Sequence, residues 1–270
     1  MMKIAIISDL HIDINKNHKV VEALIDRCRK KEADLLLVAG DISEKVKLTI
    51  ETVQKLKEEL QIPVYYVPGN HDLWNKYDTG RKTDDMYRMF CEDENCLASG
   101  SKVIGEDITL IGDIGWYDYS FGYGRYTKEE FDRMSHAGRT WQDFNFNDWS
   151  KDNEGKSEEM LRKLEQQLKD CKTKHKIVMT HMVPIPEFTV QQANEMWYYF
   201  NAFIGTEKLH ELYQKYGVQY GICGHIHCRK RMKKDGITYI CPCLNYDTEW
   251  GGEEKDVAKE MEEALVLLEC

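Results

Sequence analysis

The chain has 270 residues, of which 42% are hydrophobic and 31% are charged, and its formal net charge is −10 at pH 7. This length allows a substantial hydrophobic core, and the acidic balance disfavours a large nucleic acid as partner, because phosphate backbones repel an acidic surface. No apolar run approaches the roughly 20 residues that span a bilayer. The apolar stretch at residues 4–7 is too short for a secretion signal, so the sequence predicts a cytoplasmic protein without membrane contact. Nine cysteines without framework spacing predict reduced thiols.

Strands and helices alternate in the first 70 residues. Short apolar runs are typical of buried strands, and apolar residues three or four positions apart indicate helices. The predicted elements, in order, are a strand at 3–8, a helix at 18–32, a strand at 33–40, a helix at 47–60 and a strand at 63–69. Short connections between such elements favour right-handed crossovers and a largely parallel sheet.

A polar cluster follows each of these three strands. The clusters read SDLH at residues 8–11, GDIS at 40–43 and GNHD at 69–72. In open α/β sheets, ligands bind at the carboxyl ends of the strands. The three clusters therefore predict a shared crevice at one end of the sheet.

The middle of the chain has a different character. After a predicted strand at 107–116, residues 116–150 are rich in Tyr, Phe, Trp and Gly and lack periodicity, except for a short predicted helix at 128–134. We interpret 116–150 as an insertion that caps the site within a single domain of residues 1–270; an ordinary surface excursion is the alternative. The aromatic stretch at 193–203 is expected to join this cap.

The C-terminal half contains the remaining predicted elements. They are a helix at 157–171, strands at 175–182 and 218–225, a hairpin with Asp235-Gly236 as its turn, and a last strand at 264–269. Five cations lie within residues 228–234, which indicates a solvated hairpin strand or, alternatively, an anion-steering patch. Cys241 and Cys243 could form a metal or redox pair, but the sequence holds no second pair to complete a tetrahedral site, so packing thiols are favoured.

Acidic, amide and imidazole side chains recur wherever a predicted strand ends. The set is Asp9, His11, Asp41, Asn70, His71, His181, His225 and His227. On an extended chain, residues two apart point the same way, so the first two and the last two are each expected to form a pair. A His-x-His pair alone is open to other interpretations, such as a pair within a core strand. The four earlier clusters favour metal ligands.

The motifs DLH, GD, GNHD, H and GHIH, in this order between residues 9 and 227, resemble those of the calcineurin-like metallophosphoesterases. The resemblance implies an α/β fold, a four-layer α-β-β-α sandwich in which two sheets are flanked by helices. It also implies a dinuclear metal centre at the strand ends.

The resemblance also assigns metal ligands. It implies that Asp9, His11 and His227 hold one metal, that Asn70, His181 and His225 hold the other, and that Asp41 bridges the two. A mixed nitrogen and oxygen donor set without thiolate favours Mn, Fe, Zn or Co over a structural zinc. In the family, a hydroxide that bridges the two metals attacks phosphorus.

The histidine of GNHD has a separate implied role. In the family this residue, here His71, is not a ligand but lies beside the substrate phosphate, where it stabilises charge or protonates the leaving group. Asp72 is expected to orient its imidazole. A structural role in the turn is the alternative for each of them. Gly40, Gly69 and Gly224 each precede a ligand, where the missing side chain allows a tight turn.

The motifs bear on the substrate. The chain lacks an Asp-Arg-Gly extension after GD and has GNHD in place of GNHE, which disfavours the Ser/Thr protein-phosphatase branch. We therefore predict a phosphodiesterase that acts on a small nucleotide-like or similar phosphorylated substrate. The alternative is a phosphomonoesterase, for small molecules or proteins; a nuclease and a non-catalytic scaffold are less favoured.

The aromatic residues of 116–150 have two interpretations. They either stack on a base or sugar or pack the cap onto the domain, and packing is favoured; the residues concerned are Trp116, Tyr117, Tyr119, Phe121, Tyr123 and Tyr126. Arg125 or Arg139 could meet a second phosphate. His136 could reach the substrate from the cap, although a surface position is favoured.

Overall fold

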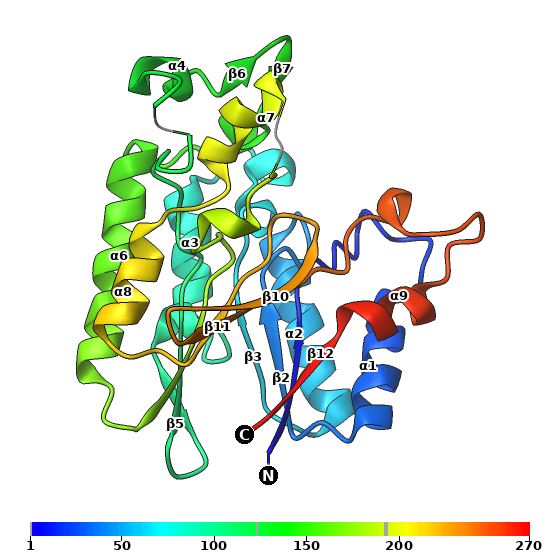
Figure 1. Cartoon of the computed structure of the whole chain (residues 1–270). Helices are drawn as coiled ribbons and strands as arrows, with labels where there is room; N and C mark the ends of the chain where they lie inside the picture. The colour runs from blue at the N-terminus through cyan, green and yellow to red at the C-terminus, as the bar shows by residue number, and fades with distance from the viewer. Residues whose placement is uncertain (1, 123, 192–193) are drawn as a thin grey trace.

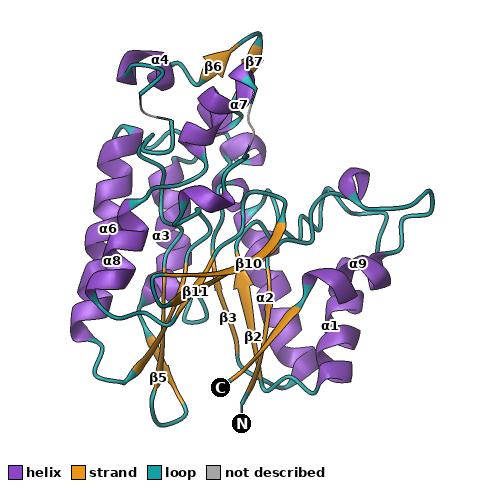
Figure 2. Ribbon diagram, in the orientation of Figure 1, coloured by secondary structure: helices purple, strands orange, loops and turns teal. Residues whose placement is uncertain are grey.

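Two β-sheets lie face to face with helices on their outer sides, in a four-layer α-β-β-α arrangement (Figures 1 and 2). The computed structural model describes residues 2–122, 124–191 and 194–270. The first sheet has the strand order β12-β1-β2-β3 and the second β10-β11-β9-β8-β5-β4. The predicted fold class is confirmed.

The strands are short and, apart from the basic strand β10, most correspond to the apolar runs of the sequence. The first sheet contains β1 (Lys3–Ile7), β2 (Leu35–Ala39), β3 (Val64–Val67) and β12 (Val266–Glu269). The second contains β4 (Lys102–Ile104), β5 (Ile108–Gly112), β8 (His175–Met179), β9 (Tyr220–Ile222), β10 (Arg229–Lys234) and β11 (Ile237–Pro242). Strands β1, β2 and β3 are parallel, as predicted, whereas β12 joins β1 in the antiparallel sense.

Helices cover both outer faces. On the first sheet lie α1 (Val20–Lys31), α2 (Val46–Leu60), α3 (Thr83–Glu92) and α9 (Val257–Ala264), and on the second lie α6 (Asn153–Asp170) and α8 (Lys208–Lys215). The sequence did not predict α3, α8 and α9. Each has ten residues or fewer and buries only two or three apolar side chains, such as Met86 and Phe90 in α3 and Met261 in α9, so the repeat is too short to stand out in the sequence.

Successive side chains of the central strands point to opposite faces of the sheet, and both faces are covered. The central strands therefore appear in the sequence as continuous apolar runs. Ile4 and Ile6 of β1 pack between the sheets, whereas Ala5 and Ile7 pack against the helices. The second sheet alternates in the same way between the inner core and the core beneath α6 and α8. Both faces of the central strands are therefore buried, which removes the polar alternation of a half-exposed strand; the edge strand β10 of the second sheet, by contrast, is partly exposed.

The two sheets are joined where the candidate site lies. The backbone N–H of Ser8, just past β1, donates to the carbonyl of Pro242 at 3.1 Å, and the N–H of Leu244 donates to the carbonyl of Ser8 at 2.9 Å. These bonds fix the end of β1 against the end of β11. The loops that follow the strands of both sheets consequently meet at one edge.

The segment 116–150 forms small elements at one end of the molecule (Figure 1). They are α4 (Lys128–Asp132), β6 (Ser135–His136), β7 (Arg139–Thr140) and α5 (Asp143–Phe146). The helix α7 (Glu195–Phe200) packs against them. The hydroxyl of Tyr199 donates to the carbonyl of Glu130 at 2.7 Å and accepts from the N–H of Ser135 at 3.0 Å. The aromatic stretch near residue 200 therefore joins this segment, as predicted.

Most of the aromatic side chains of this segment are structural. Trp116, Tyr117 and Tyr119 are at most 1% exposed. Tyr117 and Tyr119 pack against Phe203, Tyr119 also stacks on Phe131, and Trp116 stacks on Tyr117. The stacking alternative is therefore wrong for these three rings, and the packing interpretation is confirmed. Tyr123 lies outside the described residues.

The charged and polar side chains of the segment are also engaged. The guanidinium of Arg125 lies 3.4 Å from the ring centroid of Tyr198. The ring of His136 stacks on Tyr199, with centroids 4.9 Å apart. Neither side chain lines the cleft described below.

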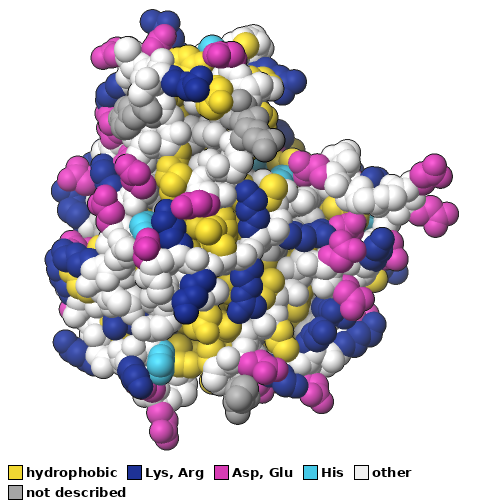
Figure 3. All heavy atoms as spheres, viewed as in Figure 1, with side chains coloured by type: hydrophobic (Ala, Val, Ile, Leu, Met, Phe, Trp, Pro, Cys, Tyr) yellow, Lys and Arg dark blue, Asp and Glu magenta, His cyan; other side chains and the backbone are white. Residues whose placement is uncertain are grey.

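The basic strand β10 is a hairpin partner of β11. Its Lys and Arg side chains lie across the middle of the face drawn in Figure 3, with acidic side chains around them. Arg229 pairs with Glu263 at 2.8 Å and Lys234 with Glu187 at 2.6 Å. This pairing fits a solvated hairpin strand. The turn at Asp235 and Gly236 has positive φ at both residues, 50° and 83°, as in a type I′ turn.

All nine cysteines, which lie within the described residues, are free thiols. Cys241 and Cys243 are buried with their Sγ atoms 3.4 Å apart. No cysteine belongs to a group of described side chains that could hold a metal ion, which fits packing thiols. Among the described helices, none is both long and apolar enough to cross a membrane.

Substitution of Gly205 tests how closely the chain after α7 packs against Val183. A Cβ at this position would lie 2.0 Å from the carbonyl oxygen of Val183, within the bridge that joins the two backbones. We expect Gly205→Ala to lower the free energy of unfolding by about 1–3 kcal/mol, as for other overpacked sites. Urea denaturation measures the change. Gly80→Ala is the control, because nothing lies within 4 Å of its Cβ position; equal losses in the two variants would contradict this account.

Candidate metal centre

The predicted site residues lie together where the loops after β1, β2, β3, β8 and β9 meet. Three groups of side chains have ligand atoms within 4.8 Å of one another. The groups are Asp9, His11 and His227; His11, Asp41 and His71; and Asp41, His181 and His225. The structure thus brings together residues more than 200 positions apart in the chain.

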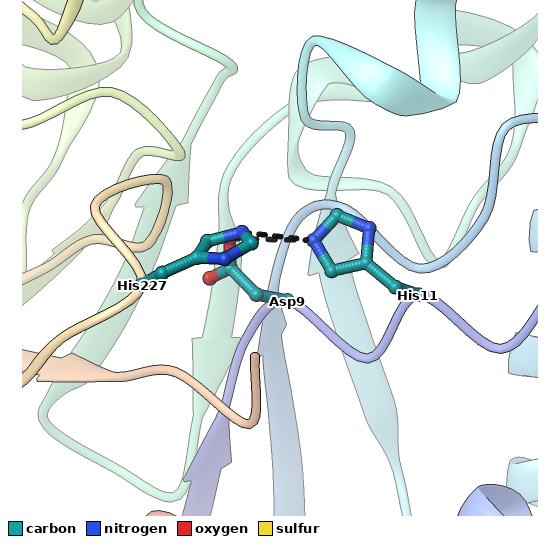
Figure 4. A group of neighbouring side chains, drawn as sticks. All are labelled: Asp9, His11 and His227. Atoms are coloured by element: carbon teal, nitrogen blue, oxygen red, sulfur yellow. Dashed lines mark hydrogen bonds and ion pairs between the residues drawn. The ribbon is translucent and has the colours of Figure 1, made fainter. Parts of the chain in front are cut away.

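The first group is drawn in Figure 4. The Nε2 atoms of His11 and His227 face each other at 3.1 Å, and Asp9 Oδ1 lies 3.6 Å from His227 Nε2 and 3.9 Å from His11 Nε2. Two imidazole nitrogens and a carboxylate oxygen therefore converge on one point. Such convergence is what a cation with nitrogen and oxygen ligands requires.

Asp41 lies between the groups. Its Oδ2 is 3.3 Å from His181 Nε2 and 3.7 Å from His11 Nε2, so one carboxylate oxygen faces imidazoles of both. Its Oδ1 accepts a hydrogen bond from the backbone N–H of His71 at 3.0 Å. This bond fixes the rotation of the carboxylate.

Asn70 adds an amide oxygen beside the second group. Its Oδ1 lies 3.1 Å from His181 Nε2, while its Nδ2 donates to Asp143 Oδ1 at 2.8 Å. The imidazole of His225 packs edge-on against that of His181, with centroids 5.1 Å apart. The amide oxygen and the two imidazoles therefore lie together on one side of Asp41.

Backbone and side-chain acceptors fix which nitrogen of each imidazole faces the centre. His181 Nδ1 donates to the carbonyl of Ala39 at 2.8 Å, and His227 Nδ1 donates to Glu249 at 2.6 Å, so Nε2 is the nitrogen of each ring that faces the centre. His225 Nε2 lies 3.2 Å from the carbonyl of Phe203, so its Nδ1 is the free atom. Outer acceptors of this kind orient metal-binding histidines.

The loops adopt an unusual backbone conformation at these residues. Five of the candidate ligands have positive φ: Asp9, His11, Asp41, His225 and His227, at 44° to 74°. Such values are uncommon outside glycine and collect at functional sites. The expected pairing of residues two apart is therefore found, but its premise of an extended chain was wrong, because left-handed residues produce it.

Glycines allow the loops to approach the ligands. A Cβ on Gly69 would lie 2.0 Å from Asp41 Oδ1, and one on Gly224 would lie 2.6 Å from Asp9 Oδ2. Both clashes involve carboxylates that are held in place, so neither can be relieved by a small rotation. Contact with those carboxylates therefore requires glycine at positions 69 and 224, whereas a Cβ on Gly40 would lie 2.5 Å from His181 Nδ1.

Burial sets the protonation of the group. Burial holds the pKa of His11 well below its usual value and lowers that of His225 to about 3. Burial would raise the pKa of Asp41, but the neighbouring imidazoles hold it well below its usual range. For His181, burial would lower the pKa, but Asp41 raises it to about 9. Neutral His11 and His225 beside an ionised Asp41 are the forms that bind metal.

His71 lies at the mouth of the site. Its Nε2 is 3.9 Å from Asp41 Oδ2 and 3.5 Å from the hydroxyl of Tyr246. Its ring stacks on Trp74, with centroids 3.6 Å apart and planes at 28°. Because it also belongs to one of the three groups, geometry alone permits it either to bind a metal or to face a substrate.

Asp72 makes different contacts from those expected. Its carboxylate accepts from the backbone N–H groups of Ile42, Ser43 and Gly69 at 2.8–3.3 Å and from the hydroxyl of Thr49 at 2.6 Å. It thus ties the GNHD loop to the GD loop. Glu44, rather than Asp72, approaches the imidazole of His71, with Oε1 3.8 Å from Nδ1.

A carboxylate from the segment 116–150 also reaches the site. Asp143 is 2% exposed and accepts from Asn70 and from the indole N–H groups of Trp74 at 2.7 Å and Trp141 at 2.9 Å. The hydroxyl of Tyr117 donates to it at 3.2 Å. One buried side chain therefore orients a candidate ligand and three aromatic rings.

A cleft of about 510 Å³ opens beside the candidate ligands. Asn70, His71, His225 and His227 line one side, and most of the remaining lining residues are aromatic or aliphatic. A cavity of this size and character is typical of small-molecule sites, which range over about 300–1,000 Å³.

The sequence did not predict several residues of this site. They are Glu44, Trp74, Trp141, Asp143, Trp197, Tyr246 and Glu249. None carries a local motif, and they come from five separate segments that only the fold brings together. The many aromatic residues of 116–150 indicated that this segment could contribute to the site. Trp141, which lines the cleft, was not among the aromatic residues proposed to stack on a substrate.

The donors fit a pair of metal ions. The atoms that face the centre are an amide oxygen, carboxylate oxygens and imidazole nitrogens. In His181 and His227, a hydrogen bond at Nδ1 directs the other nitrogen of the ring inward. Nitrogen lone pairs 3.1 Å apart repel each other unless a proton or a cation lies between them. Asp41, shared by two groups, can contact ions on both sides.

The chain is similar to known phosphoesterases in sequence. A family model described as calcineurin-like phosphoesterase matches residues 2–229. Over 76 residues, the chain is 36% identical to a probable cyclic nucleotide phosphodiesterase of Vesicomyosocius okutanii subsp. Calyptogena okutanii, covering 26% of this chain and 33% of that protein. Over 122 residues, it is 25% identical to an uncharacterized metallophosphoesterase of Helicobacter pylori, covering 44% and 30%. The chain thus matches about a third of the length of these relatives.

Solved structures are similar in fold. Phosphopantetheinyl hydrolase from Mycobacterium tuberculosis has a TM-score of 0.76 at 19% identity, over 98% of this chain and 95% of that chain. The protein TT1561 of Thermus thermophilus has a TM-score of 0.51 at 13% identity, over 98% and 97%. Identities this low concern the fold alone. Because the family model spans most of its length, the chain belongs to the calcineurin-like phosphoesterase family, whose members are dinuclear metal-dependent hydrolases of phosphoric esters.

Proposed function

We propose that this enzyme hydrolyses a small phosphodiester at a centre of two metal ions. The observation that carries the proposal is the position of Asp41, whose carboxylate lies between two sets of nitrogen and oxygen donors. Asp9, His11 and His227 would hold one ion, and Asn70, His181 and His225 the other, with Asp41 shared. The donor set suits Mn, Fe, Zn or Co.

The bound ions would supply an activated water nucleophile and a Lewis acid for the phosphoryl oxygens. The protein residues around them have separate tasks. His71, at the mouth of the site, would stabilise charge on the phosphate or protonate the leaving oxygen. Glu44 would orient its imidazole, and Asp72 would act as a positioning residue that holds the two ligand-bearing loops together.

A diester suits the cleft better than a monoester. Among the described residues that line it there is no Lys or Arg. A monoester carries one more negative charge than a diester and would depend on the metals alone to offset it. The relative named as a probable cyclic nucleotide phosphodiesterase supports a phosphodiester, and the fold neighbour named phosphopantetheinyl hydrolase supports a small phosphorylated substrate. A phosphomonoesterase is the alternative.

The remaining parts of the proposal concern organisation and location. We take residues 1–270 as a single catalytic domain in which 116–150 acts as a cap, because Trp141 and Asp143 of that segment reach the cleft. The net charge of −10 disfavours a large nucleic acid substrate. A cytoplasmic location fits the free thiols.

The reaction is tested with purified protein at a fixed Mn²⁺ concentration. We expect about two metal ions per chain by elemental analysis and faster turnover of bis(4-nitrophenyl) phosphate than of 4-nitrophenyl phosphate. A nucleotide panel extends the comparison to natural esters. Asp41→Asn, which keeps the shape but removes the charge, should lower the metal content and reduce turnover to background, as should Asp41→Ala. The exposed Asp26→Asn serves as the control. A protein that binds no transition metal and stays inactive with Mn²⁺ would overturn the proposal.

His71→Ala separates the two roles that geometry permits for this residue. If His71 acts on the substrate, the variant keeps its metal content while kcat falls by about 10²–10⁴-fold, the usual effect of losing a general acid. Elemental analysis and steady-state kinetics on the same preparation measure both. Loss of a metal ion from the variant would instead make His71 a ligand.

Asp143→Asn tests the support of Asn70. The neutral amide of the variant cannot accept all the hydrogen bonds that the Asp143 carboxylate accepts from Asn70 and the two indoles. We therefore expect one metal ion to bind about 10–100-fold more weakly, the usual effect of removing a side chain that hydrogen-bonds to a metal ligand. Titration calorimetry of the metal-free protein with Mn²⁺ measures each affinity. Asp118→Asn is the matched control, since Asp118 is a buried carboxylate of the same segment that pairs with Lys208. Unchanged affinities in Asp143→Asn would refute this role.

A further inference from the structure

The cleft beside the metal centre has a predominantly apolar wall. Three tryptophans and three aliphatic side chains line it, namely Trp74, Trp141, Trp197, Val190, Ile204 and Ile226. They come from the loop after β3, from the segment 116–150, from α7 and its flanks, and from the loop that carries the last two histidines. An apolar wall next to a charged centre indicates a ligand with one charged group and one apolar part.

Two of the tryptophans are held in fixed orientations. The indole N–H groups of Trp74 and Trp141 both donate to Asp143, so their polar atoms are satisfied away from the ligand. Trp74 stacks on His71, and Trp141 packs nearly parallel to Phe203 with centroids 5.7 Å apart. Rings that are already ordered bind a planar group with little loss of conformational entropy.

The charges around the cleft disfavour a second anionic group. The described residues that line it include the carboxylates Asp41, Asp143 and Glu249 but no Lys or Arg. Of the two arginines expected as alternatives to meet a second phosphate, Arg125 is stacked on Tyr198 and Arg139 does not line the cleft. A substrate arm that carried another phosphate would therefore face carboxylates without a compensating cation.

From these observations we propose that the cleft binds the arm of a phosphodiester that is uncharged and presents an aromatic or apolar face to the tryptophans. This inference rests on the proposed function, since the metal centre must hold the phosphate. It narrows the substrates to diesters with a single phosphate, such as those with a planar base or another uncharged arm. Esters with a polyphosphate or polyanionic arm are excluded.

Binding of three diesters that share an ethyl arm tests the proposal on the Mn²⁺-loaded protein. The probes are diethyl phosphate, ethyl phenyl phosphate and ethyl 4-carboxyphenyl phosphate. Titration calorimetry measures the affinity of the protein for each. Stacking of one ring contributes about 1–3 kcal/mol, so ethyl phenyl phosphate should bind about tenfold more tightly than diethyl phosphate. The added carboxylate should remove most of that gain. Equal binding of the first two probes, or tightest binding of the carboxylated probe, would overturn the proposal.

Substitutions of Trp197 test whether this ring causes the preference for a phenyl arm. Trp197 is the ring to change, because it does not donate to Asp143 and its removal leaves the support of Asn70 in place. We expect Trp197→Ala to reduce the preference for phenyl over ethyl by about tenfold. Trp197→Leu keeps apolar volume without an aromatic face and provides a second variant should the first misfold. Phe144→Ala, which removes a ring that is 55% exposed on α5 outside the cleft, should leave the preference unchanged. An unchanged preference in both Trp197 variants would refute the role of this ring.

The readout separates this proposal from the reaction itself. If the protein ranks the probes as expected but hydrolyses no diester, the cleft inference stands and the proposed function fails. If the protein hydrolyses diesters but does not distinguish phenyl from ethyl, the proposed function stands and the cleft inference fails.

Discussion

The buried carboxylate of Asp41 constrains the rest of the site. It is 1% exposed, its Oδ1 is held by the backbone of His71, and its Oδ2 faces three imidazoles within 3.9 Å. A buried charge of this kind is costly unless it is paired, and no Lys or Arg among the described residues forms an ion pair with it. Partial compensation comes from His181, whose pKa is raised. Divalent ions on either side would offset the charge fully, which explains why the two donor sets are arranged around this one side chain.

The loops around Asp41 hold strained backbone conformations in this arrangement. Left-handed conformations at residues such as Asp9 and His225 each cost of order 1–3 kcal/mol. Such residues persist only when the surroundings leave no alternative. Here the hydrogen bonds of Asp72, which join the GD and GNHD loops, and the bonds between the ends of β1 and β11 supply that constraint. The rigid two-sheet core thus carries strained loops at one edge, where precise placement of ligands matters most.

The sequence predicted those parts of the molecule that have local signals. Buried strands read as apolar runs because both faces of each sheet are covered, and the candidate ligands stood out because polar residues follow those runs. Local patterns did not reveal α3, α8 and α9, which are short and bury only two or three apolar side chains each. They also could not reveal that Trp74, Trp141 and Trp197 share one cleft, because each ring belongs to a different segment. The contacts of Asp72 were misjudged because adjacency in sequence to His71 does not determine which way a side chain turns in a short helical turn.

Asp143 has a consequence for how this enzyme can change. It belongs to the segment that shapes the cleft, yet it supports Asn70 at the metal centre. Under the proposed function, substrate range and metal affinity therefore depend on the same segment. An exchange of residues 116–150 for the equivalent segment of a relative would carry away the acceptor of the Asn70 amide together with the old specificity. Divergence toward new substrates, in evolution or in the laboratory, is expected to proceed by point changes around a retained acidic residue at this position rather than by wholesale replacement of the segment.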